Sequence, residues 1–475
     1  MATTIEQQPF FEKFPVGHDV MFSISNSNIV ASEEKVKIVA KVLISSEQPP
    51  NPSNNNDLVG TFKTSPNNAG VGMFNFRPII ENFVSADNIA SDYARYKNNP
   101  INISSTPLPM HIIDKFSRSK NTMVYFAVVF TTEYLDNDPA SLTYGTIIDD
   151  GTPTNTRQFR AFNGYVKYTD DILIQNNDFG FDTDVFDLTD TNGRFLTNAP
   201  LTQYANKNDY GTVPFMSSAF GTVGGSIYNL YYIDYFKIIM YNGSTILGDF
   251  EVNNTTGNGG YSSFSAKIDK HLMFFGCFPA NLQQWNSTFY SNLNGDMTHY
   301  TIQTWNLEPL PNSELITINI KCPNTKGYEP IRLTWLNQWG GWDYYTFNMK
   351  SSKSISTKGS TYQQLEGNWN ASAYRLDSYK GGKKSFRVNA TEKISMNTDF
   401  VSESESEWFE ELINSPEIYT LESLTVDHGS SSLNKYVTPV RLLTSNYTRK
   451  TVANDKLMQY TFEVEKTKTL NTQAV

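Results

Sequence analysis

The sequence predicts a mainly β, multidomain protein, with antiparallel β-sandwich-type domains and a few short helices. Aromatic residues make up 14% of the 475 residues and charged residues only 18%, a balance that favours sheets over helices. Short apolar runs recur along the chain, separated by clusters of Asn, Ser, Thr and Gly of the kind that closely spaced turns require. The length exceeds the usual size of a single core, so we expect more than one domain.

The first predicted domain is a β-sandwich that covers residues 1–150. Between Val36 and Ile44 every second residue is apolar and shares one face, and Lys35, Lys37 and Lys41 lie on the opposite face, which indicates a half-buried strand. Residues 124–130 form an unbroken apolar run of strand length, typical of a strand buried on both faces. Pro78 stands at the expected first turn of a short helix.

The second predicted domain covers residues 151–355 and is also rich in strands. Its start is placed at the polar, turn-rich segment 151–155. Strands are expected at residues 162–168, 230–240, 272–278, 300–305 and 315–321, with a glycine-containing loop at 221–225. The domain ends in EPIRLTWLNQWGGWDYYTFNMK, residues 329–350, where two alternating runs flank Gly340 and Gly341. This pattern predicts a β-hairpin with a glycine turn.

The third predicted domain covers residues 356–475 and combines strands with one amphipathic helix. Residues 351–360 are rich in Ser, Thr and Lys, and we expect them to form a loop that becomes ordered on docking. Ser402 stands three residues before Glu405, the spacing of a capping box, and an apolar stripe containing Trp408 and Phe409 follows. Further strands are expected at residues 384–389, 438–444 and 457–465.

Charge and targeting signals narrow the function classes. A net charge of −10 argues against a protein that binds nucleic acid in a sequence-specific way, and the local KGGKK at Lys380–Lys384 is interpreted as a solvated turn. No stretch approaches the ~20 apolar residues that span a bilayer, and the N-terminus does not resemble a secretory signal. We therefore expect synthesis in a cytoplasm and no membrane insertion. Cys277 and Cys322 are interpreted as buried, reduced thiols.

Catalytic and metal-binding patterns are missing from the sequence. The five histidines are widely spaced, and no nucleophile elbow, phosphate-binding loop or dinucleotide motif occurs. Carboxylates at Asp170 and Asp171 and in residues 178–187 are candidates for polysaccharide cleavage, although a solvated acidic loop is the favoured interpretation. A calcium site in residues 182–190 would depart from the EF-hand pattern. We expect no enzymatic activity, no cofactor and no metal.

Clustered aromatic residues are the candidate functional positions. The hairpin carries five of them and the predicted helix carries two: Trp335, Trp339, Trp342, Tyr344, Tyr345, Trp408 and Phe409. Exposed Trp and Tyr beside glycine can stack on sugar rings, whereas alternating aromatics in a hairpin more often pack in a core or an interface. Packing or subunit contact is the favoured interpretation, and a glycan platform is the alternative.

Several motifs in a fixed order carry a family resemblance that spans most of the chain. They are NFRPIIENFV (75–84), FLTNAP (195–200), IRLTWLNQWGGWDYYTF (331–347), SEWFEELINSPEIY (406–419), YVTPVRLLTSNYTRKT (436–451) and NDKLMQYTFEVE (454–465). This series resembles virion structural proteins of tailed phages that infect Bacteroidota, including crAss-like podoviruses. The hairpin and the C-terminal motifs are its most specific parts.

The resemblance implies a ring-forming component of the tail or head-to-tail region, such as a hub, ring or baseplate protein. Its implied partners are other virion proteins of the tail or neck and further copies of itself in a ring, and its implied location is the virion. Ring subunits need heterologous contacts that close by rotation. The alternative is a receptor-binding or polysaccharide-degrading tail protein, although no repetitive β-helical shaft is visible. A bacterial surface lectin is disfavoured by the N-terminus.

Overall fold

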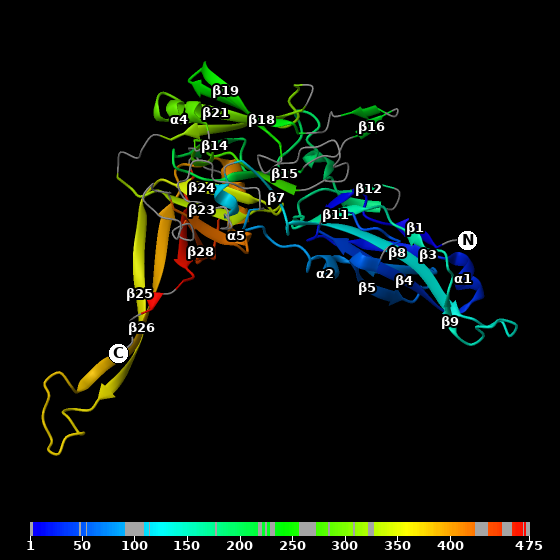
Figure 1. The fold of residues 1–475 in the computed structure, drawn as a ribbon, viewed down its shortest axis with the longest axis horizontal. Helices are drawn as coiled ribbons and strands as arrows, with labels where there is room; N and C mark the ends of the chain where they lie inside the picture. Colours follow the sequence, from blue (N-terminus) through cyan, green and yellow to red (C-terminus); the bar gives the residue numbers. More distant parts are fainter. Residues whose placement is uncertain are drawn as a thin grey trace. The chain divides into compact units, whose positions relative to one another are not determined.

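The computed structural model (Figure 1) describes residues 3–46, 49–53, 55–90, 109–113, 115–175, 178–216, 221–223, 226–228, 233–255, 272–283, 286–306, 309–321, 327–422, 436–448, 458–468 and 470–471. Packing contacts divide the chain into two units. Unit 1 comprises Met1–Lys321 and Leu336–Asp343, and unit 2 comprises Cys322–Trp335 and Tyr344–Val475. The strands of the predicted aromatic hairpin thus belong mainly to unit 2, and its tip belongs to unit 1.

Two facing sheets form a sandwich in unit 1. One sheet has the order β1-β3-β6, with β1 (Thr4–Gln7), β3 (Met21–Ser25) and β6 (Val71–Asn75). The other has the order β2-β11-β8-β4-β5, with β2 (Lys13–Pro15), β11 (Phe159–Phe162), β8 (Met123–Leu135), β4 (Glu34–Ser45) and β5 (Leu58–Thr64). The short strands β9 (Ile147–Asp149) and β10 (Thr154–Asn155) also pair with β8.

The apolar residues of these strands form the core of the sandwich. Alternate residues of β4, such as Ile38 and Val42, point into a cluster that also contains Phe22 of β3. Phe22 contacts Phe126 and Phe130 of β8 at centroid distances of 6.1 and 5.8 Å. Stacked and tilted aromatic pairs of this kind add stability beyond the apolar area that they bury. Strands β4 and β8 are both confirmed as core strands, but β4 is not half-buried as predicted, because Val39 and Leu43 on its opposite face are buried as well.

The rest of unit 1 contains smaller sheets. One has the order β14-β22-β21-β18-β19, with β14 (Thr202–Ala205), β22 (Ile316–Ile320), β21 (His299–Trp305), β18 (Tyr235–Asn242) and β19 (Thr245–Asn253). Another has the order β15-β20-β7, with β15 (Thr212–Met216), β20 (Leu272–Gly276) and β7 (Phe116–Arg118). Two hairpins pair β12 (Ile172–Gln175) with β13 (Asp178–Phe181) and β16 (Gly221–Val223) with β17 (Ser226–Tyr228).

Short helices connect the strands of unit 1. They are α1 (Ser27–Ser32), α2 (Arg77–Ile80), α3 (Pro279–Leu282) and α4 (Ser287–Asn294), together with the 3-10 turns η1 (Asn55–Asp57), η2 (Met110–Ile112) and η3 (Asp184–Phe186). The helix expected at Pro78 is confirmed as α2, with the proline in its first turn. No described helix is long and apolar enough to cross a membrane.

The described residues of unit 2 form a sheet and one helix. The sheet has the order β24-β23-β27-β28-β29-β26-β25, and β30 pairs with β26. Its strands are β23 (Ile331–Leu336), β24 (Trp342–Phe347), β25 (Ser351–Gln364), β26 (Gly382–Asn397), β27 (Ile418–Leu421), β28 (Val437–Leu442), β29 (Thr461–Lys466) and β30 (Leu470–Asn471). The helix α5 (Glu403–Asn414) begins with the predicted capping box, in which Ser402 and Glu405 bond each other's backbone N–H.

The mainly β fold with few short helices is confirmed, and several local predictions need correction. The strand expected at residues 162–168 ends at Phe162, because the next residues turn and Tyr165 donates its N–H to the carbonyl of Gln338. The loop expected at residues 351–360 is instead the first part of β25. Within the expected loop at 221–225, Gly221–Val223 forms β16. The prediction for Cys322 lies outside the described residues, while Cys277 is a buried free thiol.

The two units follow other boundaries than the three predicted domains 1–150, 151–355 and 356–475. Residues on both sides of position 151 pair with the same strand, since β9 and β10 both bond β8. Position 355 lies inside β25, and β25 shares a sheet with the hairpin strands. Turn-rich composition at 151–155 therefore marks a connection inside one sheet.

Candidate assembly surface

Five of the candidate aromatic residues lie in unit 2, and the rings of four of them, Trp335, Tyr345, Trp408 and Phe409, pack together. Trp335 is fully buried, and its ring centroid lies 4.9 Å from that of Trp408. Tyr345 contacts Phe409 edge to face at 4.9 Å. Burial raises the pKa of the Tyr345 hydroxyl, and the negative charges of Glu405 and Asp399 raise it further. Tyr344 is buried and lies beneath the guanidinium of a neighbouring arginine on β23.

The other two candidate residues lie in the hairpin tip and pack inside unit 1. Trp339 meets Phe186 edge to face at 4.9 Å and donates its indole N–H to Asn198 Oδ1 at 3.1 Å. Trp342 is fully buried, and its indole N–H reaches the carbonyl oxygen of Asp87 at 2.9 Å. Both indoles have satisfied donors and buried faces. Trp339 and Trp342 are therefore packing residues, and neither ring is accessible for stacking on a sugar.

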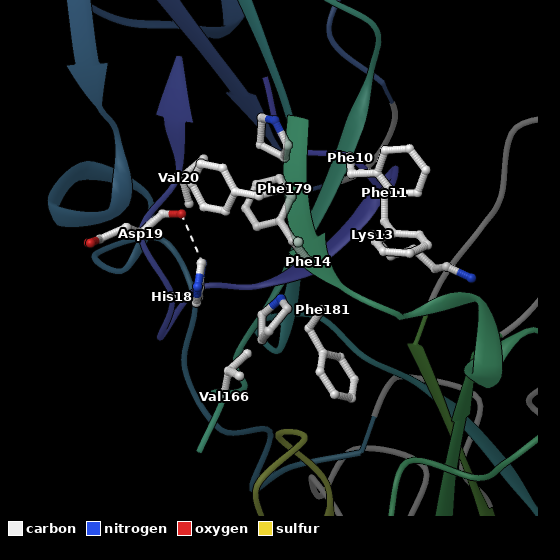
Figure 2. A pocket seen from close by; sticks show the side chains of 13 residues that line it. Phe10, Phe11, Lys13, Phe14, His18, Asp19, Val20, Val166, Phe179 and Phe181 are labelled. Atoms are coloured by element: carbon white, nitrogen blue, oxygen red, sulfur yellow. Dashed lines mark hydrogen bonds between the residues drawn. The ribbon is translucent and has the colours of Figure 1, made fainter. Parts of the chain in front are cut away.

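A small hollow opens in unit 1 beside the N-terminal segment, where phenylalanines gather around it (Figure 2). Phe10, Phe14 and Phe179 line it together with His18, whose Nδ1 lies 3.0 Å from the carbonyl oxygen of Asp19. Its volume is about 20 Å³, which is room for about one water molecule. Sites for small molecules are usually roughly 300–1,000 Å³. The hollow is therefore too small for a substrate.

Three of the carboxylates considered for catalysis or calcium binding bond residues that are distant in the sequence. Asp184 and Asp187 face the buried amino group of Lys13, whose Nζ lies 3.7 Å from Asp184 Oδ1 and 2.5 Å from Asp187 Oδ1. Burial lowers the pKa of Lys13, and Asp187 opposes that shift. Asp170 Oδ2 accepts a hydrogen bond from Gln338 Nε2 at 2.7 Å. Within the described residues no cluster of acidic, His or Cys side chains is arranged to hold a metal ion.

A β-hairpin arm in unit 2 is formed by β25, β26 and the connecting residues 365–381 (Figure 1). The two strands pair from Ser351 with Met396 to Gln364 with Gly382. Strand β29 bonds β26 only over residues 393–397 and β30 only at 389–390, so among the described residues 382–388 pair with β25 alone. Side chains on both faces of this part are exposed. The arm has no core of its own.

Apolar side chains gather at the end of the arm although it has no core. Leu365, Trp369, Tyr374, Leu376, Tyr379 and Phe386 are each more than half exposed. We call residues 358–389 the arm tip. It contains six Lys or Arg and two Asp or Glu, a net charge of +4 in a chain of −10. A basic aromatic surface on an acidic protein is a candidate contact site.

The connection in the arm tip is folded, so its aromatic residues are held in place. Asn368 and Arg375 form a bridge, with the Asn368 N–H donating to the Arg375 carbonyl at 2.8 Å. Trp369 donates its indole N–H to the Glu366 carbonyl at 2.8 Å, and its ring meets that of Tyr374 edge to face at 5.7 Å. The turn predicted over Lys380–Lys384 is only partly right: the chain turns before Gly382, and Gly382, Lys383 and Lys384 begin β26. Sequence reasoning missed the tip, and isolated aromatics beside basic residues were the available signal.

Comparisons with known proteins add little to this geometry. No family model matches the chain, and no curated protein matches it. Among solved structures it is similar to Escherichia coli alpha-2-macroglobulin in its native conformation, determined by cryo-electron microscopy, with 6% identity and a TM-score of 0.18. The match covers 83% of this chain and 22% of that chain. A TM-score of this size carries no argument about fold or function.

Proposed function

We propose that the chain is a structural protein of a tailed bacteriophage particle, a ring-forming component of the tail or head-to-tail region such as a hub, ring or baseplate protein. The motif resemblance to virion proteins of phages of Bacteroidota gives the class. The β25–β26 arm is the observation that supports an assembly role. Its partners are other virion proteins of the tail or neck and further copies in a ring.

The arm supports an assembly role for two reasons: it has little stability of its own, and its tip exposes apolar side chains that a neighbouring subunit could cover. A two-stranded hairpin without a packed face is at best marginally stable in water. Side chains on both faces of β25 and of the outer half of β26 are exposed, and the tip presents Trp369 and Leu376, each 70% exposed. Single apolar side chains are often exposed, but several gathered at one place usually mark a contact site. Docking would bury the tip and stabilise the arm.

In this proposal the protein acts without catalysis, cofactor or metal. It is made in the host bacterial cytoplasm and ends in the virion, and it makes no sequence-specific contact with nucleic acid. The acidic net charge agrees with this last point, because DNA contacts need a concentrated basic surface over the protein.

The test is the location of the chain in intact particles. Purified virions of the phage that encodes it are analysed by mass spectrometry and by cryo-electron microscopy. We expect the chain in multiple copies, with density for the arm against a neighbouring subunit. Its absence from purified particles would overturn the proposal.

A second candidate function is a receptor-binding or polysaccharide-binding tail protein, and the exposed Trp369 and Tyr374 favour it. Such a pair can stack on sugar rings, which the buried Trp339 and Trp342 cannot do. A glycan array separates the two candidates. Strong binding that disappears in Trp369→Ala, and persists in the exposed unit 1 control Tyr168→Ala, would support the second candidate.

A further inference from the structure

The arm tip needs an occupant of matching chemistry, and its own features define that chemistry. It offers exposed aromatic rings together with an excess of positive charge. Lys358 and Lys383 are exposed on β25 and β26. The tip is also pre-organised by its internal bonds, which lowers the entropy lost when it docks. The matching surface is acidic and carries exposed apolar side chains.

The chain itself contains such a surface in unit 1, at the loop between β8 and β9. We call residues 134–151 the acidic loop. It carries Asp136, Asp138, Asp149 and Asp150, and no Lys or Arg. Its apolar side chains also reach solvent, since Leu142 is fully exposed and Tyr144 and Ile147 are at least half exposed.

Hydrogen bonds give the acidic loop a fixed form and keep it charged. Asp136 Oδ1 accepts the N–H of Asp138 at 3.0 Å, and Asp138 Oδ1 accepts the N–H of Ala140 at 2.9 Å. Hydrogen bonds from Ser141, Thr143 and Asp138 lower the pKa of Asp136, so this carboxylate stays ionised well below neutral pH. Asp136 itself is buried, so the negative charge that the loop exposes beside its apolar side chains comes from Asp138 and Asp149.

The other acidic segment that the sequence singled out is a poorer match. Asp184 and Asp187 in residues 178–190 face the amino group of Lys13, which offsets their charge. Among the described residues, no Lys or Arg forms an ion pair with the four carboxylates of the acidic loop. Charge complementarity therefore favours the acidic loop as the partner of the arm tip.

We propose that the arm tip of one copy docks on the acidic loop of a second copy of this chain. This inference rests on the proposed function, because it supplies the contact by which ring subunits join. The two surfaces differ, so each copy offers one of each and the contact is heterologous. Such contacts repeat from copy to copy and close into a ring when the rotation allows it. Attraction between the charges steers the encounter, and the aromatic rings hold the contact by apolar burial.

The test is a charge exchange in the full-length chain. The arm variant is Lys358→Glu with Lys383→Glu, and the loop variant is Asn137→Lys with Ala140→Lys; all four side chains are exposed. A combined variant carries all four changes. The matched control reverses two exposed lysines of unit 2 outside the tip, Lys350→Glu with Lys468→Glu.

Self-association is measured by sedimentation velocity over a range of protein concentrations and at low and high salt. We expect the native chain to self-associate, and to do so less at high salt, where the screening length shortens to about 3 Å. The arm and loop variants should each associate about 10-fold more weakly, the combined variant should recover, and the control should match the native chain. Trp369→Ala should also weaken association, with little change in its salt dependence.

The opposite results overturn the inference. They are a native chain that stays monomeric, an arm variant that associates like the native chain, or a combined variant no better than its parents. Arm-dependent binding to anionic lipid vesicles or to single-stranded oligothymidine, without self-association, would assign the tip to another partner. If the chain is present in virions and yet fails this test, the docking inference falls and the proposed function stands. If the chain self-associates by this contact and is absent from virions, the docking contact stands and the proposed function falls.

Discussion

The interpretation of the hairpin aromatics as packing residues is tested by one substitution at two tryptophans of unit 2. Trp335 is fully buried beside Trp408 and Phe409, whereas Trp369 at the arm tip is 70% exposed. We predict that Trp335→Ala strongly destabilises unit 2 and that Trp369→Ala leaves its stability almost unchanged. Both changes remove the same atoms, so the difference reports the surroundings alone.

The expected magnitude follows from the buried area. Burying a Trp side chain removes roughly 200 Å² from water, which at ~25 cal/mol per Å² corresponds to about 5 kcal/mol. This figure is an upper bound, because alanine retains part of the area and the unfolded chain already buries some of it. Loss of the ring contact with Trp408, about 0.5–1.5 kcal/mol, offsets part of that reduction. We therefore expect a loss of about 3–5 kcal/mol for Trp335→Ala. The exposed Trp369 should change stability by no more than about 0.5 kcal/mol.

A third variant separates ring packing from hydrogen bonding. The indole nitrogen of Trp335 has no hydrogen-bond partner among the described residues. An unpaired buried donor costs about 1–3 kcal/mol, so its removal in Trp335→Phe should offset much of the volume that is lost. We expect Trp335→Phe to cost about 1 kcal/mol or less.

The assay is native-state hydrogen exchange in the full-length chain, followed in peptides from β23 and α5. It reports the opening free energy of the segment itself, and a chain with two units need not unfold in a single step. Equal opening energies for Trp335→Ala and Trp369→Ala would refute the burial argument. A Trp335→Phe variant as unstable as Trp335→Ala would refute the account of the unpaired nitrogen.

Other predictions test the local structure. Ser402→Ala removes the cap of α5 and should lower the opening energy of its first turn by about 1 kcal/mol in the same exchange experiment. Lys13→Met tests the lowered pKa of the buried Lys13 amino group. In the unfolded chain this pKa is 10.5, so at pH values between the lowered pKa and 10.5 the unfolded chain binds a proton that the folded chain does not. The native chain should therefore gain stability over the variant as pH rises through this window, measured by denaturant titration, and an unchanged difference would count against the burial. Gly340→Ala places a side chain against the carbonyl of Asn163 at a positive φ of 79°, and we expect a loss of at least about 3 kcal/mol by thermal unfolding. Gly243→Ala, where φ is 56° and nothing lies within 4 Å of the added carbon, should cost only about 1 kcal/mol.

The parts of the fold that sequence reasoning anticipated are those where burial contrasts with exposure. Alternation in β4 and the apolar run of β8 follow directly from a sandwich core. The capping box at Ser402 is local chemistry, so its residues alone specify where α5 begins. The hairpin around Gly340 is equally local, because the glycine supplies the positive φ that its turn needs.

The strand expected at residues 384–389 lies in β26, but its partner β25 and the tip escaped sequence reasoning because they lack that contrast. Both faces of β25 are exposed, so no hydrophobic alternation distinguishes this strand from a loop. Its Ser and Thr residues suit a strand as well as a turn, and only pairing with β26 decides between them. The aromatic residues of the tip are scattered along residues 365–386, and the fold brings them to one end of the arm. Such surfaces depend on long-range pairing, which a single sequence does not display.

The place of the hairpin tip in unit 1 bears on how the protein is made and how it evolves. Residues 336–343 emerge from the ribosome only after β23, a strand of the other unit, has been synthesised. Until then the sites that receive Trp339 and Trp342 stay unfilled, and a nascent chain ending at Lys321 exposes apolar surface that favours aggregation. A contiguous expression fragment of unit 1 must therefore run to Asp343 and carry a strand that its own sheets do not use. Recombination at a single point between Lys321 and Cys322 could not exchange the two units, because it would separate the core of unit 1 from Trp339 and Trp342.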